Sequence, residues 1–353
     1  MIAKVMHALG VLVLTGLLMS CEHRILEDPS NGHYVRVYID EQIKNVTYGF
    51  YSDSRKRPEY ERPRVLRVVL ADPVTNKVIT ERYLQSYGED ERGYYIDGYI
   101  AATEGNYNLM VYNFGTPKTK LRQENDYIQV QAYTSPISDN LFQYFPTLET
   151  EIDKKTVRYC PDHLFLATCE PVKIKKNLNI DTLYTTSGDY FMAQSVVKSY
   201  YIQVRIKGFE YVTTAVSLLS GMAGTTLLHK REMDENDAVS VFFTMDYTDV
   251  GRTNATTKGG YTKTAILYST FNTFGKLPHE QSVYTMNFEF TRTDGTSQVE
   301  TIDITSMFDD PLVKNEQWIL IEKEIEITPT VGGGGGLVPG VDDWGDVWSV
   351  IEL

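Results

Sequence analysis

Alternation of apolar and polar positions with a period of two is the main pattern along this chain, and helical periodicity is rare. In residues 34–40, Val35, Val37 and Ile39 point to one side of an extended chain, whereas Arg36 points to the other. The same alternation predicts half-buried strands at residues 65–71, 107–112, 201–207, 284–291 and 318–327. Residues 212–219 fit either a helix or a strand.

The strand predicted at residues 284–291 is followed by a turn signal. One of its sides is wholly apolar and consists of Tyr284, Met286, Phe288 and Phe290. The dipeptide Asp294-Gly295 comes next, and it accommodates the positive φ angles of a tight hairpin turn. We therefore expect residues 299–304 to return as the antiparallel partner of this strand.

Strand spacing decides the fold class. Short strands separated by turn residues, with few amphipathic helices between them, predict an all-β fold of antiparallel sandwiches rather than a helix-covered parallel sheet. The pattern Ile202-x-Val204-x-Ile206 repeats that of Val35-x-Val37-x-Ile39 about half a chain later, which predicts two tandem sandwich units. We place these units at residues 33–185 and 190–330, with the boundary in the polar stretch 181–189.

The N-terminus carries one apolar run, at residues 8–19 after the basic Lys4. About 20 apolar residues are needed to cross a bilayer, so this run indicates a secretory signal peptide over residues 1–20. Its end, Leu18-Met19-Ser20-Cys21, resembles the lipobox of bacterial lipoproteins, in which the cysteine carries acyl chains. We expect lipid attachment at Cys21 and a polar tether over residues 21–32. The alternative is an ordinary signal peptide that leaves Cys21 as a free thiol.

The C-terminus joins a glycine run to a short apolar segment. Residues 332–336 are five consecutive glycines, which predict a flexible linker at the start of a tail over residues 331–353. The tail ends in strand-forming residues: Val347, Trp348, Ser349, Val350, Ile351, Glu352 and Leu353. Such a segment is costly to leave exposed. We expect it either to fold back as an edge strand or to add a strand to a neighbouring molecule.

Composition and charge narrow the classes of protein. The 353 residues are 42% hydrophobic and 23% charged, which is typical of a globular chain. Lys plus Arg is 34 and Asp plus Glu is 47, giving a formal net charge of −13. Such a surface repels a phosphate backbone, so we expect no nucleic-acid partner.

Candidate chemistry is sparse. The six histidines are scattered, and the sequence contains neither a His-Glu-x-x-His motif nor a Gly-x-Ser-x-Gly elbow. We therefore expect no enzyme activity, no metal site and no cofactor, and we interpret the acidic residues 234–237 as a solvated turn rather than a calcium loop. We expect Cys160 and Cys169 to be two buried free thiols, because a straight strand holds them too far apart to bond. The alternative is a disulfide, which requires the chain to turn at Pro161-Asp162.

Several stretches together resemble the fimbrillin-like lipoproteins of Bacteroidales, which include type V pilus subunits. They are the lipobox, residues 104–113 (EGNYNLMVYN), residues 160–165 (CPDHLF), residues 220–223 (SGMA) and the glycine run with its acidic, tryptophan-bearing tail. The resemblance implies two transthyretin-like sandwich domains and a surface-exposed lipoprotein anchored in the outer membrane. It also implies assembly with other fimbrial subunits by β-strand addition.

The resemblance also implies a choice between two kinds of subunit, stalk subunits and anchor subunits. In stalk subunits an arginine-specific protease removes the first strand, whereas anchor subunits keep their lipid. The arginines available for such a cut are Arg24, Arg36, Arg55 and Arg57, and we interpret all four as solvated surface charges. An anchor or accessory subunit is therefore favoured over a stalk subunit.

The alternative function is a surface lipoprotein that binds a glycan or a host surface. The 25 tyrosines, together with Trp318, Trp344 and Trp348, offer aromatic faces on which sugar rings can stack.

Overall fold

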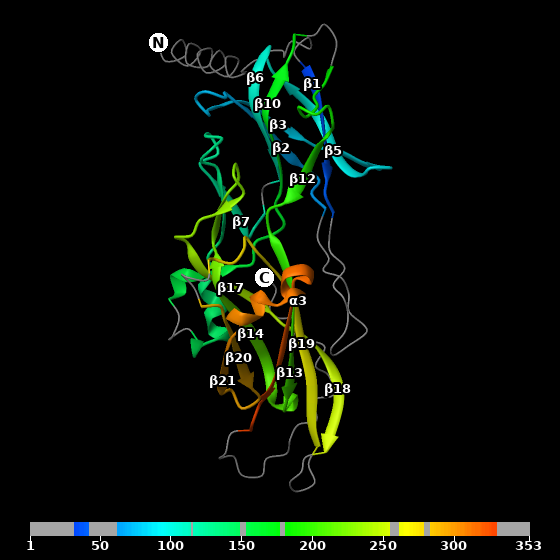
Figure 1. The fold of residues 1–353 in the computed structure, drawn as a ribbon. Coiled ribbons are helices and arrows are strands. Elements are labelled where there is room, and N and C mark those ends of the chain that lie inside the picture. Colours follow the sequence, from blue (N-terminus) through cyan, green and yellow to red (C-terminus); the bar gives the residue numbers. More distant parts are fainter. Residues whose placement is uncertain are drawn as a thin grey trace, which may run out of the picture.

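The computed structural model describes residues 32–41, 62–113, 116–148, 153–176, 181–254, 261–278 and 283–329. Within these ranges the chain is built mainly of β-strands (Figure 1). None of the helices described there has the length and apolar character needed to cross a bilayer. The predicted all-β fold class is confirmed.

Residues of the first half form one sheet that folds into two layers, at the top of Figure 1. Its strands are β1 (Gly32–Ile39), β2 (Leu66–Ala71), β3 (Val78–Leu84), β4 (Ser86–Asp90), β5 (Gly93–Ala101), β6 (Gly105–Tyr112), β10 (Phe165–Ile174), β11 (Asp181–Thr182) and β12 (Phe191–Ser195). The order is β3-β2-β6-β10-β12-β1-β5-β4, with β11 beside β1. Val37 and Ile96 of one layer meet Val68 and Leu109 of the other in a common core.

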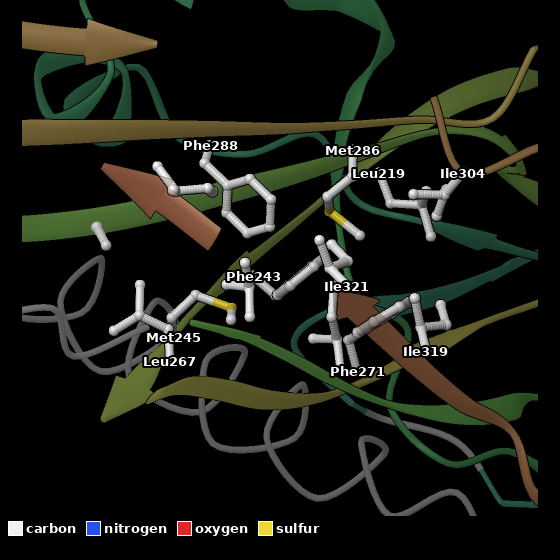
Figure 2. Packing of buried hydrophobic residues seen from close by; sticks show 14 of the residues in the cluster. Leu219, Phe243, Met245, Leu267, Phe271, Met286, Phe288, Ile304, Ile319 and Ile321 are labelled. Carbon is white, nitrogen blue, oxygen red and sulfur yellow. The ribbon is translucent and has the colours of Figure 1, made fainter. Parts of the chain in front are cut away.

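The second half contains two facing sheets. The first has the order β18-β19-β13-β22, with β13 (Lys198–Lys207), β18 (Asp246–Asn254), β19 (Tyr261–Thr273) and β22 (Trp318–Glu326). The second has the order β21-β20-β14-β17-β9, with β9 (Val157–Tyr159), β14 (Val212–Ala223), β17 (Ala238–Thr244), β20 (Thr285–Arg292) and β21 (Ser297–Asp303). Figure 2 shows their shared core, in which Phe243, Phe271, Met286 and Ile321 interdigitate.

The hairpin expected after residues 284–291 is present. β20 and β21 pair antiparallel from Thr285↔Asp303 to Thr291↔Ser297, and Gly295 takes the left-handed φ of +82° between them. The four apolar residues predicted to share one side, Tyr284, Met286, Phe288 and Phe290, are fully buried. Residues 212–219, for which the sequence allowed either a helix or a strand, belong to strand β14.

Short helices complete the fold. The α-helix α3 (Pro311–Glu316) begins at Asp310, whose side chain accepts a hydrogen bond from the Leu312 N–H at 2.7 Å. An N-cap of this kind satisfies one of the free N–H groups of the first turn. Four 3-10 helices lie within the described residues, at Asp139–Tyr144, Lys154–Thr156, Phe209–Tyr211 and Thr305–Asp309.

A small fourth sheet links strands from the two halves of the chain. Its order is β16-β15-β8-β7, with β7 (Thr119–Arg122), β8 (Gln131–Thr134), β15 (Thr225–Leu227) and β16 (Glu232–Met233). The register of β8 on β15 runs from Thr225↔Tyr133 to Leu227↔Gln131. β9 likewise pairs with β17. Local sequence patterns do not predict this pairing, and the domain boundary expected at residues 181–189 stays a prediction.

A buried carboxylate fastens the first half of the chain to the second. Glu289 of β20 points away from the sandwich core, yet its exposed fraction is 0%. Its Oε1 accepts a hydrogen bond from the Thr147 N–H at 3.0 Å, and its Oε2 accepts one from the Leu148 N–H at 2.9 Å. Residues 137–148 cover this side of the sheet, where Phe145 packs in one cluster with Val216.

Candidate functional site

The outer side of β1 carries aromatic and charged residues. Val35, Val37 and Ile39 face the core, so the intervening Tyr34, Arg36 and Tyr38 face the opposite side, because side chains alternate along a strand. β5 pairs antiparallel with β1 and contributes the cross-strand partners of these three residues. The pairs are Tyr34↔Tyr99, Arg36↔Asp97 and Tyr38↔Tyr95.

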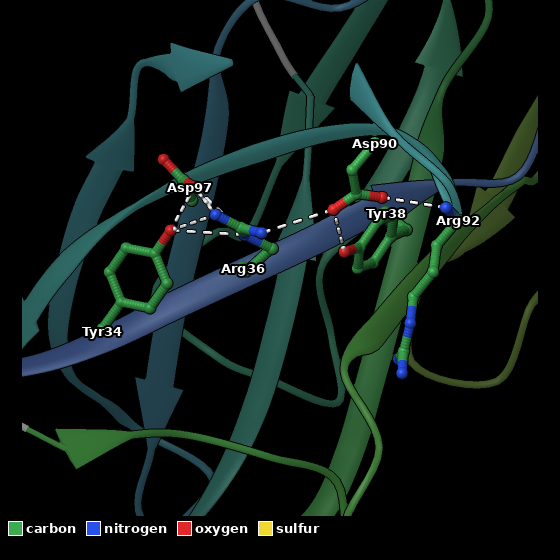
Figure 3. Close-up of polar contacts among 6 residues, drawn as sticks. All are labelled: Tyr34, Arg36, Tyr38, Asp90, Arg92 and Asp97. Atoms are coloured by element: carbon green, nitrogen blue, oxygen red, sulfur yellow. Dashed lines mark hydrogen bonds and ion pairs between the residues drawn. The ribbon is translucent and has the colours of Figure 1, made fainter. Parts of the chain in front are cut away.

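Arg36 lies at the centre of a hydrogen-bond network on this side (Figure 3). Its Nη2 donates to the Tyr34 hydroxyl at 2.9 Å and to Asp97 Oδ2 at 3.0 Å. The Tyr34 hydroxyl in turn donates to the same Asp97 oxygen. The side chain of Asp97 is only 7% exposed, and a buried carboxylate requires such partners. The network therefore fixes the position of the Arg36 guanidinium.

A second carboxylate, Asp90 at the end of β4, lies on the other side of Arg36 (Figure 3). Its Oδ2 is 3.5 Å from Arg36 Nη1 and accepts a hydrogen bond from the Tyr38 hydroxyl at 2.7 Å. Its Oδ1 accepts one from the Arg92 N–H at 2.9 Å. The hydrogen bond from Tyr38 lowers the pKa of Asp90, so this carboxylate is ionised at neutral pH.

The Tyr34 hydroxyl keeps its proton at neutral pH. Burial raises its pKa to about 12, and the hydrogen bond to Asp97 acts in the same direction. Tyr34 thus donates to Asp97 while it accepts from Arg36. The network therefore holds its hydrogen-bonding arrangement throughout the neutral range.

Six tyrosines surround this network, and we call them the tyrosine face: Tyr34, Tyr38, Tyr95, Tyr99, Tyr184 and Tyr190. Ring centroids lie 5.4 Å apart for Tyr34 and Tyr99, and 5.7 Å apart for Tyr38 and Tyr95. The chain of rings continues from Tyr38 to Tyr190 at 5.6 Å and on to Tyr184 at 5.2 Å. Tyr99 is 56% exposed and Tyr184 is 41% exposed, so the face ends in open rings on two sides.

Local structure makes room for these rings. Gly88 of β4 is the cross-strand partner of Tyr95, and a Cβ at position 88 would lie 2.6 Å from the Tyr95 hydroxyl. The Arg36 guanidinium stacks 3.8 Å from the centroid of the Tyr95 ring, a cation–π contact. The face can bind a ligand by stacking and hydrogen bonding.

Most of the residues predicted to act at a site fall outside the described ranges. They are Cys21, the tail residues Val347 to Leu353, the arginines Arg24, Arg55 and Arg57, and the tryptophans Trp344 and Trp348. In the ranges that are described, no three His, Cys, Asp or Glu side chains group as a metal site.

Cys160 and Cys169 are both free cysteines in the structure, so the disulfide alternative is not formed. The Cys160 thiol donates to the Phe242 carbonyl oxygen at 3.2 Å. Burial raises the pKa of this thiol to about 12, which keeps it protonated and unreactive at neutral pH. Cys169 is buried, and its sulfur lies 3.8 Å from the Thr186 hydroxyl.

Two sequence interpretations are corrected here. Arg36 is not a solvated surface charge, because its side chain is 23% exposed and is bound by two carboxylates. Trp318 offers no surface for a sugar, because it is 2% exposed and its ring packs edge-on against Tyr201 at 5.9 Å. The tyrosine face has one signal in the sequence, the spacing Tyr34-x-Arg36-x-Tyr38. This spacing alone does not identify Asp90 or Asp97 as partners of Arg36.

Comparisons with known proteins show which folds and sequences this chain resembles. Residues 86–244 match a family described as "Domain of unknown function (DUF5119)". A crystal structure titled as a "putative adhesin from Bacteroides ovatus" matches with a TM-score of 0.55 at 21% identity, covering 89% of this chain and 99% of that one. The chain therefore has the all-β fold of that adhesin structure. The fimbrial anchor protein Mfa2 from Porphyromonas gingivalis matches with a TM-score of 0.41 at 12% identity, covering 78% and 83% of the two chains.

One curated relative has a more specific name. It is named "Putative fimbrium anchoring subunit Fim4B" and comes from Bacteroides ovatus. The two proteins are 26% identical over 265 residues, which cover 70% of this chain and 75% of the relative. The predicted resemblance to fimbrial subunit proteins of Bacteroidales is thereby confirmed.

Proposed function

We propose that this chain is a non-catalytic fimbrial subunit of the anchor or accessory type. The observation that carries the proposal is its 26% identity over 265 residues with a relative named as a fimbrium anchoring subunit. In this role the chain is an outer-membrane lipoprotein held by acyl chains on Cys21. It joins other fimbrial subunits by adding the strand at residues 347–353 to their sheets.

The pairing of β1 argues against removal of the first strand by a cut at Arg36, and to that extent supports an anchor rather than a stalk subunit. β1 pairs with β5 on one side and with β11 and β12 on the other, so both of its edges are hydrogen-bonded. Arg36 lies inside this strand and is held by Asp97 and Asp90. A protease cannot bind an arginine in a paired central strand without first unfolding it. Retention of the first strand and of the lipidated segment before it is the property expected of an anchor.

The last described residues of the chain belong to the second core. The Ile327 N–H donates to the Lys207 carbonyl oxygen at 2.8 Å, and the Ile327 side chain is buried in the second core. All described residues of both sandwich cores lie before the glycine run at 332–336. Removal of residues 337–353 therefore keeps every described side chain of these cores, which supports a tail that acts separately from them.

We expect deletion of residues 337–353 to abolish incorporation into fimbriae while leaving the body folded. The far-UV circular dichroism and the thermal unfolding midpoint should match those of the full chain, because every described core residue is kept. Incorporation is measured by immunoblotting fimbriae sheared from the native host. The matched control replaces Asp342 and Asp343 by Asn, which keeps the apolar strand and should assemble normally. Unfolding of the truncated chain, or its normal assembly, would contradict strand donation.

A further inference from the structure

The tyrosine face contains none of the residues that the assembly proposal uses. Its strands β1 and β5 lie inside the sheet, where each has a hydrogen-bonded neighbour on both edges. β1 is paired on both edges, and β5 is paired with β4 along residues 93–97 and with β1 along residues 95–101, so this surface offers little free backbone edge for strand addition. Whatever binds at this face does so through side chains.

We propose that the tyrosine face binds an uncharged glycan, with Tyr99 and Tyr184 stacking on separate sugar rings and with Arg36 and Asp90 hydrogen-bonding to hydroxyls between them. This inference goes beyond the fimbrial role and does not depend on it. It assigns a ligand class to a group of residues that assembly leaves unused.

Ring placement supports a ligand of several sugar units. Tyr99 and Tyr184 are the two most exposed tyrosines of the face, at 56% and 41%. Tyr99 contacts Tyr34, and Tyr184 ends a second row of ring contacts through Tyr190 and Tyr38 to Tyr95. The Arg36 guanidinium lies over both Tyr34 and Tyr95 and so joins the two groups of rings. Aromatic rings present flat apolar surfaces of this kind at low conformational cost. A chain of sugars can lie across both ends, whereas a single sugar reaches one.

The polar groups between the two ends match hydroxyls. A sugar hydroxyl both donates and accepts, so it is recognised best by a donor and an acceptor fixed side by side. Arg36 supplies N–H donors and Asp90 supplies carboxylate oxygens, with 3.5 Å between Nη1 and Oδ2. Their side chains are 23% and 37% exposed, so both reach the surface. A hydrogen bond from Arg36 to the Tyr34 hydroxyl and one from the Tyr38 hydroxyl to Asp90 hold them in place before any ligand arrives.

Charge balance indicates a neutral glycan rather than an anionic one. Arg36 is already paired with Asp97 and Asp90. The second cation of the face is Arg92, whose guanidinium lies 5.3 Å from the Tyr190 ring centroid. The two cations Arg36 and Arg92 balance the two carboxylates Asp90 and Asp97, so the face has no excess of positive charge. The formal net charge of the whole chain is −13. A sialylated or sulfated glycan would therefore meet repulsion.

The test uses the mature full-length chain on an array of neutral oligosaccharides, namely glucans, mannans, galactans and desialylated mucin glycans, with sialylated and sulfated members alongside. Calorimetry then measures the affinity for the best-bound member. The variant is Tyr99→Ala/Tyr184→Ala, and the matched control is Tyr83→Ala, which changes a tyrosine of β3 that is 47% exposed at the other end of the sheet order.

We expect the wild-type chain to bind neutral members, and the double variant to lose about tenfold or more in affinity, because both rings that stack on the sugars are removed. Tyr83→Ala should bind as the wild type does. The thermal unfolding midpoint and incorporation into fimbriae should be unchanged in both variants, which separates this inference from the assembly proposal. Failure to bind any neutral member, preference for charged members, or full binding by the double variant would overturn it.

Discussion

Replacing Cys21 by serine is expected to move nearly all of this protein from the membrane fraction to the soluble fraction. Each buried methylene of an acyl chain contributes about 0.8 kcal/mol, and two or more chains give stable anchoring where one gives only reversible binding. Serine supplies no thiol for the acyl transfer, so every chain is lost at once. In the described residues no helix offers a substitute membrane anchor.

The measurement is fractionation of host cells followed by intact mass determination of the membrane-bound protein. Cys160→Ser and Cys169→Ser serve as matched controls, because both side chains belong to the folded body and should leave the protein in the membrane fraction. A wild-type protein without added acyl mass, or a Cys21→Ser variant that stays with the membrane, would refute lipid attachment at this residue.

Replacing Glu289 by alanine is expected to lower the free energy of unfolding by about 4 kcal/mol. The carboxylate accepts hydrogen bonds from the Thr147 and Leu148 N–H groups. Each buried donor left without a partner costs about 1–3 kcal/mol. Both cross-strand neighbours of Glu289, Val216 and Val299, belong to the apolar cluster that residues 137–148 cover, so alanine leaves a dry cavity with two unpaired donors.

Chemical denaturation gives the free energy, and hydrogen exchange at the Thr147 and Leu148 amides reports the local effect. Glu289→Gln should lose about half as much stability, because one amide oxygen still accepts while its NH₂ faces the second donor. Glu322→Ala, which changes an exposed glutamate of β22, should stay within about 0.5 kcal/mol of the wild type. A loss below about 1 kcal/mol in Glu289→Ala would show that these hydrogen bonds do not hold the two segments together.

Local alternation was sufficient to predict six of the strands and their inner sides, at residues 34–40, 65–71, 107–112, 201–207, 284–291 and 318–327. The side chains of Tyr107, Leu109 and Val111 face the core as their spacing predicts, and the Tyr107 hydroxyl donates to the Thr103 carbonyl oxygen at 3.0 Å. Such agreement is expected where one side of a strand is buried, because a shift by one residue would expose every apolar side chain. The hairpin of β20 and β21 could be predicted for the same reason. Its Asp294-Gly295 turn was a second signal, because a tight hairpin turn requires positive φ angles.

Long-range pairing could not be predicted in this way. The alternation places Glu289 on the polar, outer side of β20. It is buried only because residues 137–148, which are far away in the sequence, pack over it. The partners of Arg36 could not be predicted either, because Asp90 and Asp97 come from other strands, β4 and β5. A period of two separates the inner side from the outer side but carries no information about what covers the outer one.

The most direct test of the proposed function is to isolate fimbriae from the native outer membrane and identify the neighbours of this chain by cross-linking and mass spectrometry. A fimbrial anchor subunit predicts that the chain is recovered with its lipidated Cys21, at the membrane end of the filament, and cross-linked through residues 347–353 to another fimbrial subunit. Purified filaments that lack this chain, in cells whose membranes contain it, would contradict a fimbrial role.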